Sequence, residues 1–226
     1  MRRNFLSLVF CALILPCMAT AEEFTTDFNV GPEGWLAGFA DYPVGSEKFY
    51  ELESGMQPYE TAAGESGKAF MLSGVNHSDD LCMYLSQRIA GLKPNTRYDV
   101  QFSVTFASSA PAGSAGVGGA PGEGVVIKAG VTRQRPMNFG RYARMNIGKG
   151  NQTASGRDAK TIGNVAVDVP ADSPSFKLKT LTSSNIPFSF KTDGVGGGWL
   201  FVCSDSGFEA KTVLYFTRIS AILTSR

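Results

Sequence analysis

Two alternating runs of apolar residues, separated by a proline-containing turn, constrain the fold more than any other feature of this sequence. In the first run Leu81, Met83 and Leu85 fall on one face, and in residues 98–106 every second residue is apolar. A period of two is typical of β-strands that bury one face. Residues 91–96 between the runs supply a proline with a fixed φ and small polar side chains, which predicts a tight corner.

The first 21 residues have the parts of a secretory signal peptide: Arg2 and Arg3, an apolar stretch over 5–18, and small residues ending at Ala21. We expect cleavage after Ala21 and export of residues 22–226 to the periplasm or the outside. A retained membrane span is disfavoured because the apolar run is shorter than about 18 residues and contains a proline. A lipoprotein processed at Cys17 is disfavoured because Pro16 stands where that site needs a small residue.

The size and charge of the chain set limits on its partners. The mature chain would have 226 − 21 = 205 residues, enough for one large all-β domain. The formal net charge is +1, and no long run of Lys or Arg follows the signal. The sequence therefore indicates neither a nucleic-acid partner nor binding to an anionic membrane.

The remaining sequence reads as many short strands separated by turns. Residues 38–45, 53–67 and 108–124 are expected to be loops, and 148–160 to be polar and exposed. We expect 212–223 to be a long strand paired on both sides, and further strands at 24–28, 48–52, 68–72, 125–131, 142–147, 162–169, 176–181, 187–191 and 199–203. Since no helical period is sustained over three turns, the prediction is an all-β, mainly antiparallel fold, a single jelly-roll-like β-sandwich.

Two of the four cysteines belong to the signal, which leaves Cys82 and Cys203. In an oxidising compartment they allow one disulfide, and closing so long a loop would stabilise the fold by about 4 to 5 kcal/mol at most. The alternative is two separate buried thiols. Neither cysteine has the Cys-x-x-Cys spacing of a redox or zinc site.

Carboxylates and amides gather in the expected turns. Calcium takes hard oxygen ligands from such loops, so a calcium site is a hypothesis for Asp79, Asp80, Asp205 and Glu209. Apart from this ion, no cofactor is indicated. The same carboxylates could instead act as acid and base on a glycosidic bond, which requires a pair roughly 5 to 9 Å apart.

Aromatic residues near the N-terminus could bind sugar rings. Trp35, Phe39, Tyr42 and Tyr50 could form a stacking platform beside polar loop groups, or they could simply fill a core. His77 is the only histidine, no Gly-x-Ser-x-Gly elbow accompanies it, and a turn residue is the competing interpretation. The candidate ligand-binding residues are Trp35, Asp41, Tyr42, Asn76, His77, Asn146, Lys149 and Asn151.

Two resemblances accompany these patterns. The corner Leu92-Lys93-Pro94-Asn95-Thr96-Arg97-Tyr98 resembles the Leu-x-Pro-x-Thr-x-Tyr turn of fibronectin type III domains and of galactose-binding-like jelly rolls such as carbohydrate-binding modules. The resemblance implies that the tyrosine hydroxyl bonds to upstream backbone. Because the mature chain is about twice as long as an immunoglobulin-like domain, the larger jelly roll is preferred.

The second resemblance spans most of the mature chain. Residues 31–35, 39–43, 76–81, 144–152 and 205–209 are together similar to a group of secreted bacterial proteins with no assigned function. Within that group Cys82 and Cys203 look peculiar to this sequence, which slightly favours a bonded pair.

These features lead to one functional expectation and two alternatives. We expect an exported, non-catalytic binding or accessory protein, with a glycan as the leading ligand class. The alternatives are a glycan-acting enzyme that uses the loop carboxylates, and a structural envelope protein with a protein partner.

Overall fold

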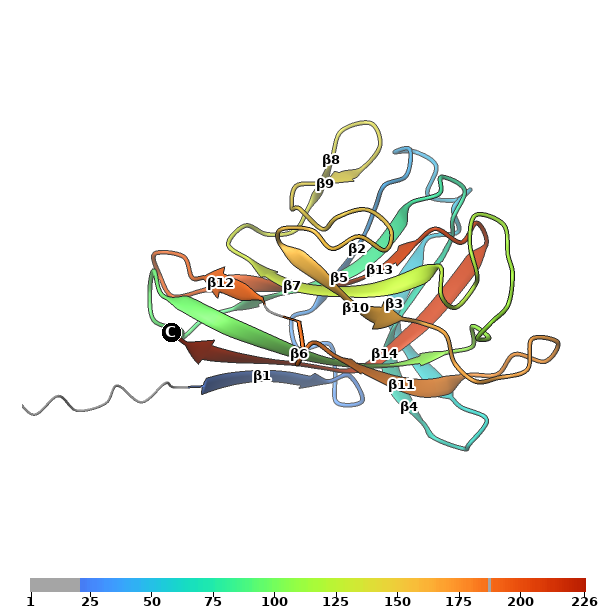
Figure 1. The fold of residues 1–226 in the computed structure, drawn as a ribbon, viewed down its shortest axis with the longest axis horizontal. Coiled ribbons are helices and arrows are strands. Elements are labelled where there is room, and N and C mark those ends of the chain that lie inside the picture. The colour runs from blue at the N-terminus through green and yellow to red at the C-terminus, as the bar shows by residue number, and fades with distance from the viewer. Residues whose placement is uncertain (1–20, 187) are drawn as a thin grey trace, which may run out of the picture.

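The computed structural model describes residues 21–186 and 188–226, which form two β-sheets packed face to face (Figure 1). One sheet has seven strands in the order β11-β6-β14-β4-β3, with β1 beside β14 and β12 beside β6. Its strands are β1 (Ala21–Asp27), β3 (Glu53–Glu60), β4 (Ser66–Val75), β6 (Arg97–Ser108), β11 (Lys177–Thr182), β12 (Ser189–Lys191) and β14 (Lys211–Ser225).

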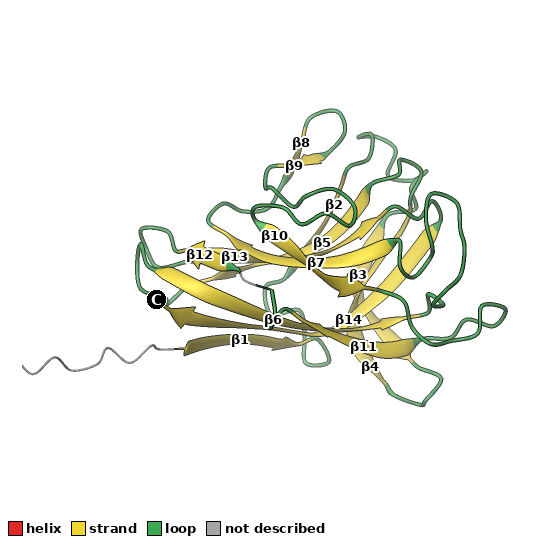
Figure 2. Cartoon of the chain, viewed as in Figure 1, coloured by secondary structure: helices red, strands yellow, loops and turns green. Residues whose placement is uncertain are grey.

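The other sheet has five strands in the order β10-β7-β13-β5-β2. Its strands are β2 (Leu36–Ala40), β5 (Leu81–Ile89), β7 (Val125–Thr132), β10 (Ala159–Asn164) and β13 (Gly198–Ser206). A short hairpin of β8 (Asn138–Phe139) and β9 (Arg144–Met145) lies outside both sheets. The named strands pair antiparallel throughout, and Figure 2 shows only strands and loops in the described chain. The predicted all-β, jelly-roll-like sandwich is confirmed.

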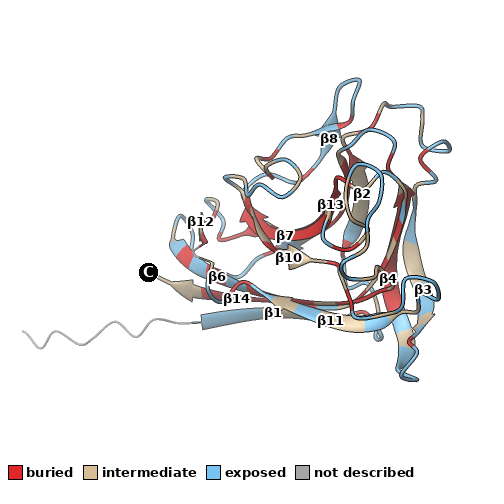
Figure 3. Ribbon diagram, turned by 45° about the vertical axis from the view of Figure 1, so that its right-hand side comes forward, coloured by how far each residue is buried: buried red, intermediate tan, exposed pale blue. Residues whose placement is uncertain are grey.

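The alternating pattern of the two runs places one face of each in the core. Leu81, Met83 and Leu85 of β5 and Val104 of β6 are buried in one apolar cluster between the sheets. The Lys93 backbone N–H donates to the hydroxyl oxygen of Tyr98 at 3.0 Å, as the corner motif implies. Figure 3 shows that β7 and β13 of the same sheet as β5 are buried along most of their length.

The long C-terminal strand holds the seven-stranded sheet together. β14 pairs with β6 and β4 and, beyond the end of β4, with β1. The prediction of a long strand paired on both sides is therefore confirmed.

Several sequence-based expectations were wrong at the edges of the sheets. Residues 48–52 form a turn, in which the Tyr50 N–H donates to the Ser46 carbonyl at 2.9 Å. Residues 53–60, expected to be a loop, form β3, an edge strand largely open to solvent, so its sequence lacks an apolar period. Residues 36–40 form edge strand β2, although 38–45 were expected to be a loop. The strand expected at 142–147 shrinks to the two residues of β9.

The expected signal peptide lies outside the described residues except for Ala21, which begins β1. Pro187 of the strand expected at 187–191 is also outside them. No helix in residues 21–186 and 188–226 is long and apolar enough to span a membrane.

Candidate functional site on the outer face of the five-stranded sheet

The outer face of the five-stranded sheet carries an unusual mixture of side chains. Because Leu200 and Val202 of β13 point into the core, Phe201, Cys203 and Asp205 point outward. Ladder pairing places Tyr84 of β5 and Lys128 of β7 on either side of Cys203. This row contains an aromatic ring, a thiol and an ammonium group.

Residues 133–158, which connect β7 to β10, form a covering segment over this face. Figure 1 shows its β8–β9 hairpin on the side of the five-stranded sheet away from the seven-stranded sheet. The segment bonds to the chain after β2: the Asp41 N–H donates to the Ala143 carbonyl at 3.1 Å, and the Val44 N–H to the Arg141 carbonyl at 3.0 Å. Ile147 packs against the sheet in a second, smaller apolar cluster with Ala40, Cys82, Tyr84, Ala159, Phe201 and Cys203.

A cluster of charged groups lies beneath the covering segment. The Nζ of Lys128 is 2.6 Å from Asp205 Oδ2, and both side chains are inaccessible to solvent. Lys149, from the covering segment, places its Nζ 2.8 Å from the same oxygen and 3.0 Å from Asp41 Oδ2. Asp80 Oδ1 is 3.7 Å from that ammonium group. These five residues, called the charge cluster below, hold two ammonium groups and three carboxyl groups.

With all five groups ionised, the charge cluster has a net charge of 2 − 3 = −1, so a single bound proton would bring it to zero. Asp80 is the group that the surroundings favour for this proton. Burial, with the nearby charge of Asp205 and a hydrogen bond to it, raises the pKa of Asp80 to about 7. Burial disfavours the charge on Lys149, but the acidic groups around it outweigh this effect and raise its pKa. Lys149 therefore remains an ammonium group.

The polar residues before β5 lie beside the charge cluster. Asn76 is buried, and its Nδ2 donates to the Ser206 carbonyl at 2.7 Å, which joins this turn to the end of β13. With its amide nitrogen toward Asp80, Asn151 donates to Oδ1 of that carboxyl group at 2.8 Å. The structure thus brings together Asp41, Asp80, Asn76, Lys149, Asn151 and Asp205, all of them predicted candidates. The expectation that 148–160 is exposed was wrong at Lys149, which is buried.

The two cysteines lie next to each other under the covering segment. They are diagonal neighbours on β5 and β13, since Cys82 pairs with Asp205 and Cys203 with Tyr84. Both are free, buried thiols. Burial is the main cause that raises the pKa of Cys82, and its hydrogen bond to Cys203 raises this pKa further. The structure therefore has two adjacent thiols, and the disulfide stays a prediction.

The four residues of the calcium hypothesis are not brought into one set of ligands. Asp80 and Asp205 meet, but both face the Lys149 ammonium group, so a positive charge already lies beside these carboxyl groups. Asp79 and Glu209 are exposed and form no ion pair with this lysine. Over residues 21–186 and 188–226, no group of three or more His, Cys, Asp or Glu side chains could hold a metal ion.

Most of the expected stacking platform lies inside the protein. Trp35 is 4% exposed and its Nε1–H donates to Thr26 Oγ1 at 3.1 Å, while Tyr42 and Tyr50 are also buried. We therefore assign these rings to the core, the alternative considered for them above. His77 is exposed and stacks on Phe49, with ring centroids 4.1 Å apart.

One aromatic ring at the surface, that of Trp199, was expected only to be part of a strand and was not named as a candidate for ligand binding. Trp199, at the start of β13, is half-buried on the outer face of the sheet, and the Arg135 guanidinium group lies 5.5 Å from its ring centroid. Its ladder partner Thr132 lines a groove of about 230 Å³. The other lining residues are Arg133, Gln134, Asn146, Ile147, Arg157 and Asp158. The groove thus offers hydroxyl, amide, carboxylate and guanidinium groups, and the indole ring of Trp199 adjoins it through Thr132 without lining it.

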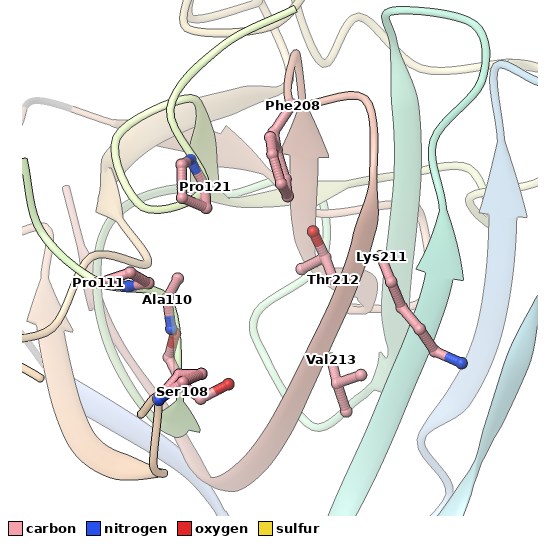
Figure 4. Close-up of a pocket in the computed structure, with 10 residues that line it drawn as sticks. Ser108, Ala110, Pro111, Pro121, Phe208, Lys211, Thr212 and Val213 are labelled. Atoms are coloured by element: carbon pink, nitrogen blue, oxygen red, sulfur yellow. The ribbon is translucent and has the colours of Figure 1, made fainter. Parts of the chain in front are cut away.

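A second groove, of about 220 Å³, lies where β6 and β14 diverge (Figure 4). Its walls include Pro111, Pro121, Pro174 and Phe208. In the close-up the Lys211 side chain points away from the prolines, and its Nζ pairs with Glu51 at 2.8 Å. This groove is lined mainly by apolar and small polar residues.

The fold is that of a β-sandwich, and comparisons with solved structures find proteins of that kind at low similarity. A carbohydrate-binding module described as recognising mannan has 10% identity and a TM-score of 0.40, covering 92% of this chain and 99% of the module. A xylan-binding module has 11% identity and a TM-score of 0.36, with coverage of 90% and 97%.

The enzymatically active domain of a bacteriophage CBA120 tailspike protein has 9% identity and a TM-score of 0.38. This alignment covers 86% of the present chain but only 20% of the tailspike chain. No family model and no curated protein sequence matches. At these values the likeness concerns the fold, and the function has to be argued from the site.

Proposed function

We propose that the exported chain is a non-catalytic glycan-binding protein. Its site would be the groove lined by Thr132, Gln134 and Asn146 together with the adjoining Trp199 ring, called the Trp199 groove below. The observation that carries the proposal is a half-buried indole ring on a sheet face, next to a groove lined by polar side chains. A sugar ring has apolar C–H faces that pack on an aromatic ring and hydroxyl groups that need directional partners. Thr132, Gln134 and Asn146 supply such partners at the groove.

The site is held in place before any ligand arrives. The Asn146 Nδ2 donates to the Arg135 carbonyl at 2.9 Å, and its Oδ1 accepts from the Met137 N–H at 2.9 Å. The charge cluster fixes the other part of the covering segment through Lys149. A preorganised groove loses little conformational entropy on binding.

The test is a glycan array, containing neutral and acidic oligosaccharides, probed with purified residues 22–226 and two variants. Trp199→Ala should lose binding at least tenfold, because it removes the stacking surface. Phe49→Ala is the matched control, since Phe49 is an exposed ring on a different loop, and it should bind like wild type. Absence of any glycan binding, or equal loss in both variants, would contradict the proposal.

A catalytic role has one observation in its favour, the pKa of about 7 at Asp80, a value suited to proton transfer near neutral pH. In that case Asp80→Asn would abolish turnover of a polysaccharide while Trp199→Ala would only weaken it. An assay for new reducing ends with the wild type and both variants separates this enzyme from the binding protein that we propose.

A further inference from the structure

We infer that the ligand of the Trp199 groove is an acidic glycan, held by carboxylate or sulfate groups on an arginine-rich surface formed by the covering segment. The inference rests on the proposed glycan-binding function and adds the chemical class of the sugar. Charge is distributed unevenly along the chain.

The covering segment is strongly basic within a nearly neutral protein. Between residues 133 and 158 there are six basic side chains and one acidic side chain, a net charge of 6 − 1 = +5, whereas the whole chain carries +1. The basic residues are Arg133, Arg135, Arg141, Arg144, Lys149 and Arg157.

Two of these charges are neutralised by nearby carboxylates. Lys149 belongs to the charge cluster, and Arg157 forms an ion pair with Asp158 at 2.8 Å. The other four, Arg133, Arg135, Arg141 and Arg144, are exposed and have no carboxylate within ion-pair distance in the described chain. Asp41 and Asp80, which belong to the charge cluster, are paired with Lys149 instead. The outer surface therefore keeps four unpaired guanidinium groups.

These arginines lie on two arms of the segment that run side by side. The bonds of Asn146 to Arg135 and Met137 join the arm that follows β7 to the arm that contains Arg144. Phe139 and Tyr142, both more than half exposed, lie at the turn between the arms. A guanidinium group is planar and can donate two parallel hydrogen bonds to a carboxylate or sulfate group. The Arg135 guanidinium group lies over the Trp199 ring, 5.5 Å from its centroid, and so holds such donors directly at the indole ring.

The groove favours a sugar over another polyanion. Its polar lining includes acceptors as well as donors, because Asp158, Thr132, Gln134 and Asn146 supply oxygen atoms. Sugar hydroxyls can donate to these oxygens, whereas the phosphates of a nucleic-acid backbone only accept. An acidic glycan matches both the oxygens of the groove and the surrounding arginines.

The test compares binding of four probes by isothermal titration calorimetry: trigalacturonic acid for carboxylates, a short dextran sulfate for sulfates, maltotriose as the neutral sugar, and a short DNA duplex as a polyanion of another class. Arg133→Gln/Arg141→Gln/Arg144→Gln removes three charges and leaves Arg135 and Trp199 in place. The control, Lys68→Gln/Lys93→Gln/Lys191→Gln, removes three exposed charges from other parts of the surface. Thermal unfolding verifies that both variants fold.

At least one acidic probe should bind tenfold or more tightly than maltotriose, and the arginine variant should lose at least tenfold of that affinity. Its binding should also depend less on salt, since it neutralises fewer ligand charges. The lysine control should stay within twofold of wild type. The two acidic probes show which anion is preferred.

Equal affinity for neutral and acidic probes, or no effect of the arginine variant, would overturn the inference and leave glycan binding intact. Binding of a DNA duplex as tight as that of the acidic probes would also contradict it. Failure of every sugar on the array and in calorimetry would remove the proposed function itself.

Discussion

Lys128 and Asp205 form an ion pair with no access to solvent, which makes each residue depend on the other. The pair lies on neighbouring strands of the five-stranded sheet, and the oxygen that accepts Lys128 also accepts Lys149. Removing one charge from such a pair leaves a buried charge with too few partners.

Lys128→Met should therefore lower the free energy of unfolding by about 3 kcal/mol, measured by urea denaturation. Lys211→Met is the control, because its ion pair with Glu51 is half exposed on both sides. The control should cost less than about 1 kcal/mol. Equal losses in the two variants would show that Lys128 is not held as described.

Asp80 gives the stability a specific dependence on pH. Its pKa is raised to about 7 in the folded protein, above the ordinary value of 3.8, so the folded state binds the proton more tightly than the unfolded state. The contribution of this group is therefore fully present below about pH 4 and is lost as the pH rises toward 7.

Asp80→Asn mimics the protonated form, so its free energy of unfolding should match that of the wild type at pH 4. At pH 8 the variant should be more stable than the wild type by about 1 to 2 kcal/mol, a value reduced because solvent screens this partly exposed site. Asp193→Asn should be less stable than the wild type at pH 8, because a hydrogen bond from Arg88 stabilises the charged form and lowers the pKa of Asp193. Thermal unfolding at both pH values measures this. A lower melting temperature for Asp80→Asn at pH 8 would refute the assignment.

At the level of single residues, the sequence allowed part of the site to be predicted. Asp41, Asp80, Asn151 and Asp205 were named because carboxylates and amides concentrate in turns, and the structure brings them together. Lys128 was missed because a lysine on the polar side of an alternating strand usually points to solvent, and here the covering segment buries it.

Among the elements, the corner between β5 and β6 follows most directly from its sequence. The Tyr98 side chain is buried, and its hydroxyl oxygen accepts the Lys93 N–H. The aromatic ring therefore fixes the turn to the start of β6.

Tyr98→Phe should lower the free energy of unfolding by about 1 to 2 kcal/mol, because it leaves the Lys93 N–H without its acceptor. Tyr142→Phe, which removes an exposed hydroxyl, should have almost no effect. Chemical denaturation of both variants checks this prediction, and a neutral Tyr98→Phe would mean that the corner does not depend on this bond.

Central strands were easier to predict than edge strands. β6 and β14 bury one face, so their sequences alternate. β5 also alternates at Leu81, Met83 and Leu85, although the covering segment buries its outer face as well. β3 is an edge strand whose side chains are exposed or only partly buried, and no period in its sequence indicates a strand. β2 could not be separated from the aromatic loop after it, since the partner that makes it a strand, β5, lies more than forty residues further along the chain.

In the whole molecule, the covering segment gives the two faces of the five-stranded sheet different roles. The inner face belongs to the core, whereas the outer face carries the charge cluster at one end and Trp199 near the other. The covering segment could not be placed from the sequence, because its residues indicate only a short strand at 142–147 and an exposed polar stretch after it. Its position depends on bonds to residues after β2 and to Asp205, all distant in the chain.

The two tryptophans allow the glycan-binding claim to be measured at a single residue. Trp35 is buried with its Nε1–H bonded to Thr26, whereas Trp199 is the ladder partner of Thr132, which lines the groove. Their indole N–H groups give two separate signals in a ¹H–¹⁵N NMR spectrum, and Trp199→Ala assigns them. On titration with trigalacturonic acid, we predict that the Trp199 signal shifts and saturates while the Trp35 signal stays in place. Movement of the Trp35 signal alone, or of neither signal with any glycan found on the array, would contradict the account.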